Sequence, residues 1–154
     1  MNPSFDAIEG NAWRALLVAE KMPWSLLDTG KVFRWRIDPA LNAIVVDMRQ
    51  TANTKDEKLA DYFRAVDAAI DTHKPELLVF DLRMNGGGDL TSTRDFAERL
   101  PTRIKGRIFI LTSPWTFSAA ISTAGYVKQA APARTTIVGE QVGDTLNFSL
   151  KADR

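Results

Sequence analysis

The sequence predicts an α/β fold with a largely parallel central sheet. Segments with strand and helix patterns alternate from about residue 32 onward. Two strand segments, Leu77 to Leu82 and Arg107 to Leu111, are almost continuously apolar, which is typical of strands covered on both faces. A glycine-rich loop follows the first and a hydroxyl-rich loop the second. In parallel sheets such loops meet at the carboxyl edge, where binding sites form.

The chain begins with a weakly patterned region, residues 1–30, that is predicted to be an N-terminal helical segment. Its apolar residues have helical spacing, interrupted by Gly10 and ended near Pro23: Phe5, Ile8, Ala12, Leu16 and Leu17. Residues 31–154 show no repeat, low-complexity tract or linker that would divide them. They are predicted to form one core domain.

A hairpin is predicted at the start of this core. Phe33, Trp35 and Ile37 alternate with Arg34 and Arg36, which predicts a strand with one solvent-facing side. After a turn at Pro39, Ile44 to Met48 forms the second strand. Thr54 and Glu57 have the spacing of a capping box and predict a helix over 55–72. The later elements are a short helix ending near Pro101, a helix over 117–131 and a strand over 135–138.

Composition excludes several classes of function. The 154 residues carry a formal net charge of +1, so no strong field favours a nucleic acid partner or an anionic membrane. There is no cysteine, and His73 is the single histidine, too few for a zinc site of the usual kind. The sequence therefore predicts no metal and no cofactor. It also contains no apolar run of ~18 residues that would predict a membrane span, and no secretory signal pattern at its start.

The first candidate site is the segment DLRMNGGG, Asp81 to Gly88, which leaves a buried strand. Three consecutive glycines permit positive φ, close approach of another group, and amides that point at an anion. A tight turn is the simpler interpretation of three glycines alone. A nucleotide site is disfavoured because the GxGxxG spacing and the P-loop lysine are absent.

The second candidate site is Ser118, in the segment TSPWTFSAA between a buried strand and a helix. A hydroxyl in the first helical turn suits a nucleophile, because the helix dipole and free amides stabilise developing negative charge. Ala119 and Ala120 leave room for a substrate. Most serines at such positions cap the helix, but Thr116 can serve as the cap here, which leaves Ser118 without an obvious structural role.

In order, DLRMNGGG, IFILTSPWTFSAA and TTIVGE resemble the core of the C-terminal processing (tail-specific) serine proteases and their tricorn-like relatives. The resemblance covers about Val32 to Asn147. It implies a crotonase-like or ClpP-like spiral of strand-strand-helix units, an incomplete catalytic core over 31–154, and a polypeptide substrate. It also favours a periplasmic or otherwise extracytoplasmic protein. Oligomeric state stays open.

The resemblance assigns roles to individual residues. Ser118 matches the nucleophile, and the backbone amides of Gly87 and Ala119 match the oxyanion hole. Gly86 or Gly88, which also match substrate-binding positions, could replace Gly87 if the loop register is shifted. Glu140 matches a glutamate that could orient the base, although a solvated turn residue is an equal alternative.

Asp81 and Arg83 match the family's strand-end motif. We expect them to brace the glycine loop through hydrogen bonds, because an Asp and an Arg at the end of a strand more often have this structural role than a chemical one.

A general base for Ser118 is harder to assign, because it must lie within ~3 Å of the hydroxyl. The family's Ser-Lys dyads take a lysine from the loop after the glutamate, and here that loop, 141–145, has none. His73 is placed ~20 Å from the glycine loop by the length of the following strand. Lys128 lies ~15 Å from Ser118 along the predicted helix.

Two further groups near the end of the chain are candidates for the base. Lys151 follows a predicted strand, 146–150, and has no context that places it. Asp144, like Glu140, is a carboxylate, which usually orients a base and does not replace it. Tricorn-like members take a histidine from an upstream segment, and no histidine precedes His73. The 154 residues are therefore predicted to lack the complete catalytic set, as a fragment or as a pseudoenzyme.

Three functions follow, in order of preference. The first is a serine peptidase that accepts an extended polypeptide near Ser118, along a strand edge. The second is an inactive peptide-binding domain that kept the fold and lost the base. The third is a crotonase-type acyl-CoA enzyme, which ranks last because a serine at a helix start suits a covalent mechanism and not a hydratase.

Overall fold

A computed structural model describes residues 23–143 of the chain. The chain separates into two compact units at Val32. In the first unit the described residues contain a short 3-10 helix, η2 (Trp24–Leu26), which follows Pro23. The helical pattern predicted over residues 5–17 lies outside the described residues.

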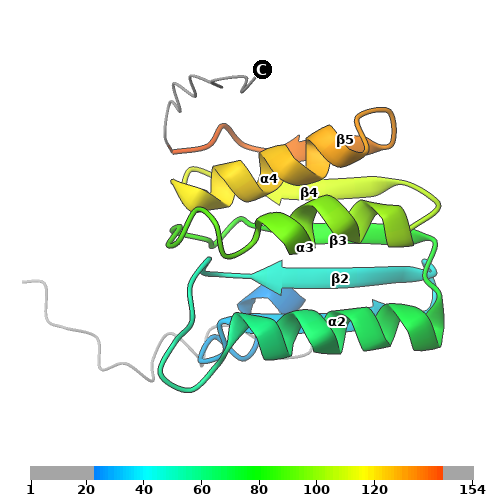
Figure 1. The fold of residues 1–154 in the computed structure, drawn as a ribbon, viewed down its shortest axis with the longest axis horizontal. Helices are drawn as coiled ribbons and strands as arrows, with labels where there is room; N and C mark the ends of the chain where they lie inside the picture. The colour runs from blue at the N-terminus through cyan, green and yellow to red at the C-terminus, as the bar shows by residue number, and fades with distance from the viewer. Residues whose placement is uncertain (1–22, 144–154) are drawn as a thin grey trace, which may run out of the picture. The chain divides into compact units, whose positions relative to one another are not determined.

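The second unit is built on a five-stranded sheet with the strand order β1-β2-β3-β4-β5 (Figure 1). β1 and β2 are antiparallel and form the predicted hairpin, while β2 to β5 are parallel. The strands are β1 (Phe33–Asp38), β2 (Ala43–Met48), β3 (Leu77–Asp81), β4 (Ile108–Thr112) and β5 (Thr135–Gly139). The predicted α/β class with a largely parallel sheet is confirmed.

Helices connect the successive parallel strands and lie on the same face of the sheet (Figure 1). They are α2 (Leu59–His73), α3 (Arg94–Arg99) continued by the 3-10 helix η3 (Leu100–Arg103), and α4 (Ala119–Ala130). Each crossover connection leads to the next strand on the same side of the previous one. Because such connections share one handedness, all the helices lie on one face of the sheet. Within the described part of the chain, no helix is long and apolar enough to cross a membrane.

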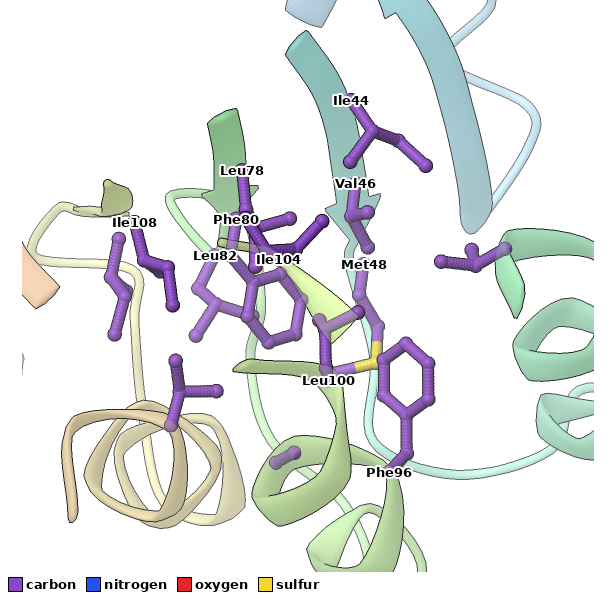
Figure 2. Packing of buried hydrophobic residues seen from close by; sticks show 14 of the residues in the cluster. Ile44, Val46, Met48, Leu78, Phe80, Leu82, Phe96, Leu100, Ile104 and Ile108 are labelled. Carbon is purple, nitrogen blue, oxygen red and sulfur yellow. The ribbon is translucent and has the colours of Figure 1, made fainter. Parts of the chain in front are cut away.

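The hydrophobic core fills the layer between this face of the sheet and the helices. Figure 2 shows apolar side chains of β2 and β3 directed toward Phe96 and Leu100. Alternate residues of each strand supply the core, because successive side chains of a strand point to opposite faces. The largest buried side chains are Phe80, Phe96, Ile44, Met48, Leu78 and Leu82.

Helix α2 begins at Leu59, four residues later than predicted. Thr54 Oγ1 accepts a hydrogen bond from the backbone amide of Glu57, as in a capping box. The Glu57 carboxylate, however, accepts the amide of Val32 at 2.9 Å and so ties this turn to the start of β1. The helix is capped instead by Asn53, whose Oδ1 accepts the Leu59 amide at 2.9 Å.

Arg34 is buried, although the alternation in β1 predicted that it would face solvent. It lies directly opposite Asp47 in the hairpin register, and its Nε donates to Asp47 Oδ2 at 2.9 Å. The Tyr62 hydroxyl lies 3.0 Å from the backbone carbonyl oxygens of both residues. Pairing with a carboxylate makes burial of the Arg34 guanidinium tolerable. Trp35, which the alternation predicted to be buried, is 37% exposed.

Asp47 should make folding stability depend on pH. Its pKa is raised, because the loss of solvation on burial outweighs the attraction of Arg34. The folded state therefore binds a proton at this carboxyl more readily than the unfolded chain does. This contribution to stability is largest below the pKa of the unfolded chain, about 3.9, and it is lost as pH rises through the higher pKa of the folded protein. We expect the unfolding free energy of the wild type, relative to Asp47→Asn, to fall as pH rises from about 3 to 8. A difference that is constant or grows over that range in urea denaturation would contradict this.

Candidate active site

The loops that follow β2, β3 and β4 meet at the carboxyl edge of the sheet. The Thr51 amide donates to the Gly87 carbonyl at 2.9 Å, and the Phe117 amide donates to the Asn85 carbonyl at 3.0 Å. The glycine loop therefore lies between the loop after β2 and the loop that carries Ser118. The two segments singled out in the sequence are neighbours in the fold.

Ser118 has a strained backbone, with φ of 52° and ψ of −123°. Residues other than glycine rarely adopt a positive φ, and such strain persists only where the surrounding structure holds it. Ser118 immediately precedes α4 and is partly buried, and its side chain makes no capping hydrogen bond. No residue within 23–143 hydrogen-bonds to its Oγ. The hydroxyl is held at a helix start without a hydrogen-bond partner in the described part of the chain.

Thr116 does not cap α4, contrary to the prediction from the sequence. Its Oγ1 donates to the Leu82 carbonyl at 2.8 Å and accepts the Ser113 amide at 3.0 Å. The hydroxyl thus joins the loop before α4 to the end of β3, because the parallel register puts β3 and β4 side by side. This connection holds the loop that carries the strained serine.

Gly87 lies against Ser118 so closely that only glycine fits. It has φ of +100°, and a Cβ built on it would lie 2.9 Å from Ser118 Cβ and 2.9 Å from the Phe117 carbonyl oxygen. Real Cβ atoms essentially never come that close to such neighbours. The second of the three glycines is therefore required by close approach and not only by the turn.

Asn85 is the residue that sequence reasoning missed. It is fully buried, its Nδ2 donates to the Met48 carbonyl at 2.8 Å, and its Oδ1 accepts the Gly87 amide at 2.9 Å. The Asn85 backbone carbonyl also accepts the Phe117 amide, so Asn85 joins β2, the glycine loop and the serine loop. The available signal was an amide side chain between a buried strand and three glycines, a position where hydrogen bonds to the backbone are common.

The oxyanion-hole expectation changes in one respect. The Gly87 amide already donates to Asn85, so in this conformation it is engaged. The amides of Gly88 and Ala119 have no acceptor among the residues that the structure describes. The nitrogen of Ala119, the first residue of α4, lies 3.4 Å from a Cβ built on Gly87. Gly88, named above as an alternative, thus has an uncommitted amide; it is exposed, as is Gly86, and Gly87 is the buried glycine of the three.

Asp81 and Arg83 brace the glycine loop as expected. The Arg83 guanidinium donates to both carboxylate oxygens of Asp81, at 2.9 and 2.6 Å. The Arg83 carbonyl in turn accepts the Ser113 hydroxyl. This pair fixes the start of the loop and contacts the serine loop through the backbone.

Glu140 lies at the same edge, just after β5. Its amide donates to the Thr112 carbonyl at 3.2 Å, and its carbonyl accepts the Thr112 hydroxyl at 2.9 Å. Its side chain is exposed and has no hydrogen-bond partner within the described ranges. Three residues later the Gly143 amide donates to the Thr116 carbonyl, which brings this loop to the serine loop.

Two basic residues, Lys128 and His73, lie at the opposite edge of the sheet. Lys128 Nζ donates to the carbonyls of Pro132 and Thr135, and Thr135 is the first residue of β5. His73 is the last residue of α2 and precedes the amino end of β3. Both lie where the sequence placed them, away from Ser118. Asp144 and Lys151 lie outside the described residues.

The fold and these contacts define the chain as an α/β protein with a serine-and-glycine site at the carboxyl edge of a mostly parallel sheet. No protein-family model matches the chain, and no curated protein matches it in sequence. Solved structures do match. The photosystem II D1 C-terminal processing protease aligns over 73% of this chain and 37% of its own, with a TM-score of 0.57 and 16% identity.

Two bacterial structures give similar results. A protein from Parabacteroides merdae, provisionally described as a peptidase, aligns over 73% of this chain and 44% of its own, with a TM-score of 0.56 and 15% identity. A protein from Bacteroides fragilis, provisionally described as an S41 protease, aligns over 71% and 38%, with a TM-score of 0.52 and 15% identity. The chain thus spans less than half the length of each, and over the matched part it shares the fold of C-terminal processing proteases, as the motif order predicts.

Proposed function

We propose that this chain carries the core of a serine-type peptidase that cleaves extended polypeptides, with Ser118 as the nucleophile. The observation that carries the proposal is the strained Ser118, held at the start of α4 in direct contact with Gly87. A sharp, strained turn between a strand and a helix is how α/β hydrolases expose a nucleophilic hydroxyl. The family likeness in fold and motif order adds support from an independent direction.

In this mechanism Ser118 Oγ attacks the carbonyl carbon of the scissile peptide bond. The Ala119 amide, at the positive end of the α4 dipole, and the Gly88 amide donate to the oxyanion that forms. A base takes the hydroxyl proton and passes it to the departing amine, and water then hydrolyses the acyl-enzyme. The base comes from outside residues 23–143, and Glu140 is a carboxylate at this edge that could orient it.

A fluorophosphonate probe tests the assignment in the full natural protein. We expect it to modify Ser118, as read by peptide mapping, and Ser118→Ala to abolish the labelling. Ser122→Ala is a matched control, since Ser122 lies one turn further along α4 and its buried hydroxyl has no hydrogen-bond partner among the described residues. Labelling should survive that change. An unlabelled protein, or a label on a different residue, would refute the role of Ser118.

A further inference from the structure

A hollow of about 410 Å³ opens at the same edge of the sheet, beside the glycine loop. Its floor is apolar and is formed by Ala52, Leu59 and Phe63, with the exposed Ala60 beside them. Its rim is polar and includes Ser92 and Asp89. This volume falls within the range of pockets that bind small ligands, and it exceeds what one large side chain needs.

The glycine loop contacts both Ser118 and the wall of this hollow at Ala52. Gly87 contacts Ser118, and the next residue, Gly88, packs against the loop after β2: a Cβ built on it would lie 3.1 Å from Ala52 Cβ. The loop is fixed there by the amide of Asp89, which donates to the Thr51 carbonyl at 3.2 Å. Side chains on one face of an extended peptide are ~7 Å apart. A peptide that crosses the two glycines with a carbonyl at Ser118 can therefore place a nearby side chain in the hollow.

The charge on the rim indicates which side chain fits. Asp89 is the one charged residue that lines the hollow, and no ion pair involves it within residues 23–143. Its Oδ1 accepts the Thr91 amide and hydroxyl, both at 2.7 Å. These hydrogen bonds lower the pKa of Asp89, so it carries its charge at neutral pH. Lysine and arginine combine an apolar stem with a cationic end, which matches an apolar floor and an anionic rim.

We propose that this hollow binds a lysine or arginine side chain of the polypeptide, with the stem against Ala60 and Phe63 and the cationic group at Asp89. The proposal rests on the proposed function in one respect, that a polypeptide crosses the glycine loop. It adds a substrate class to that function: polypeptides with a basic residue close to the bond at Ser118.

Peptide binding tests the proposal separately from catalysis. The full natural protein carrying Ser118→Ala is titrated, by fluorescence anisotropy, with peptides in which one position at a time is lysine, norleucine or glutamate. Norleucine keeps the stem of lysine and lacks its charge. At one position we expect lysine to bind about two- to five-fold more tightly than norleucine, the effect of an exposed ion pair, and glutamate to bind more weakly than both. About 1 M salt should remove the lysine advantage.

Three further substitutions show where that preference arises. Asp89→Asn should remove the lysine advantage and leave norleucine binding unchanged. Asp95→Asn makes the same charge change at an exposed residue outside the hollow, and it should preserve the advantage. Ala60→Trp, at an exposed position of α2, should fill the hollow and weaken lysine and norleucine peptides alike.

Equal binding of lysine and norleucine at every position, no binding of any peptide, or a preference that survives Asp89→Asn would each overturn the proposal. Fluorophosphonate labelling of the wild type separates this from the hydrolase assignment. If the probe labels Ser118 but no peptide position prefers lysine, only the proposed role of the hollow is refuted. If the lysine preference depends on Asp89 but the probe does not label the protein, the hollow is supported as a peptide site and the hydrolase assignment is refuted.

Discussion

Replacing Gly87 by alanine is expected to destroy most of the reactivity of Ser118 toward a fluorophosphonate. The new Cβ would lie 2.9 Å from both Ser118 Cβ and the Phe117 carbonyl oxygen, so the serine loop must move. A displacement of about 1 Å at a reacting group can reduce the rate about 100-fold. An alanine held at the φ of +100° found at Gly87 adds strain of about 1–3 kcal/mol to the folded state of the variant. Labelling rates and urea denaturation of the same preparation measure both effects.

Gly86→Ala is the matched control for this prediction. Gly86 is the preceding glycine of the same loop, yet a Cβ built on it meets nothing within 4 Å and it has no positive φ. We expect a stability change within about 0.5 kcal/mol and a labelling rate close to that of the wild type. Equal losses in the two variants would mean that the contact between Gly87 and Ser118 does not position the serine.

The isolated chain of 154 residues is expected to show no measurable turnover of an unstructured protein substrate above its Ser118→Ala variant. A serine nucleophile without its base loses about six orders of magnitude in rate in well-studied serine proteases. Within 23–143 nothing hydrogen-bonds to Ser118 Oγ, and Lys128 is held at the amino end of β5. Release of fluorescence from a labelled, unfolded protein substrate measures the rate.

Clear turnover that disappears in the Ser118→Ala variant would contradict this prediction. It would direct attention to Lys151, a basic residue that lies outside the described range. Ser122→Ala again serves as the control, because it alters α4 without touching the proposed nucleophile.

The order and type of the main elements could be predicted because they depend on local patterns. The apolar runs that became β3 and β4 are continuous in the sequence, and the strands and helices alternate in a regular rhythm. That rhythm also put the glycine loop and the Ser118 loop at one edge, since successive parallel strands end at the same edge. The parts of the site that follow from topology were therefore predictable.

The contacts that shape the site join residues that are far apart in the sequence. Asn85 reaches Met48 across 37 residues, and Thr116 reaches Leu82 across 34. No local pattern encodes these partners, because they depend on the register between β2, β3 and β4. For this reason the sequence pattern predicted a helix cap at Thr116, and the hydrogen bond from the Gly87 amide to Asn85 could not be predicted.

The burial of Arg34 shows the same division. Alternation in β1 correctly indicated a strand, but whether its polar side faced solvent depended on the residue opposite. The hairpin register puts Asp47 there, and an ion pair replaces the water that an isolated guanidinium would need. Hydrophobic periodicity is a property of neighbouring residues and could be read from the chain. Hydrogen bonds, ion pairs and the strained backbone of Ser118 are properties of surfaces brought together by folding, and only the tertiary structure decided them.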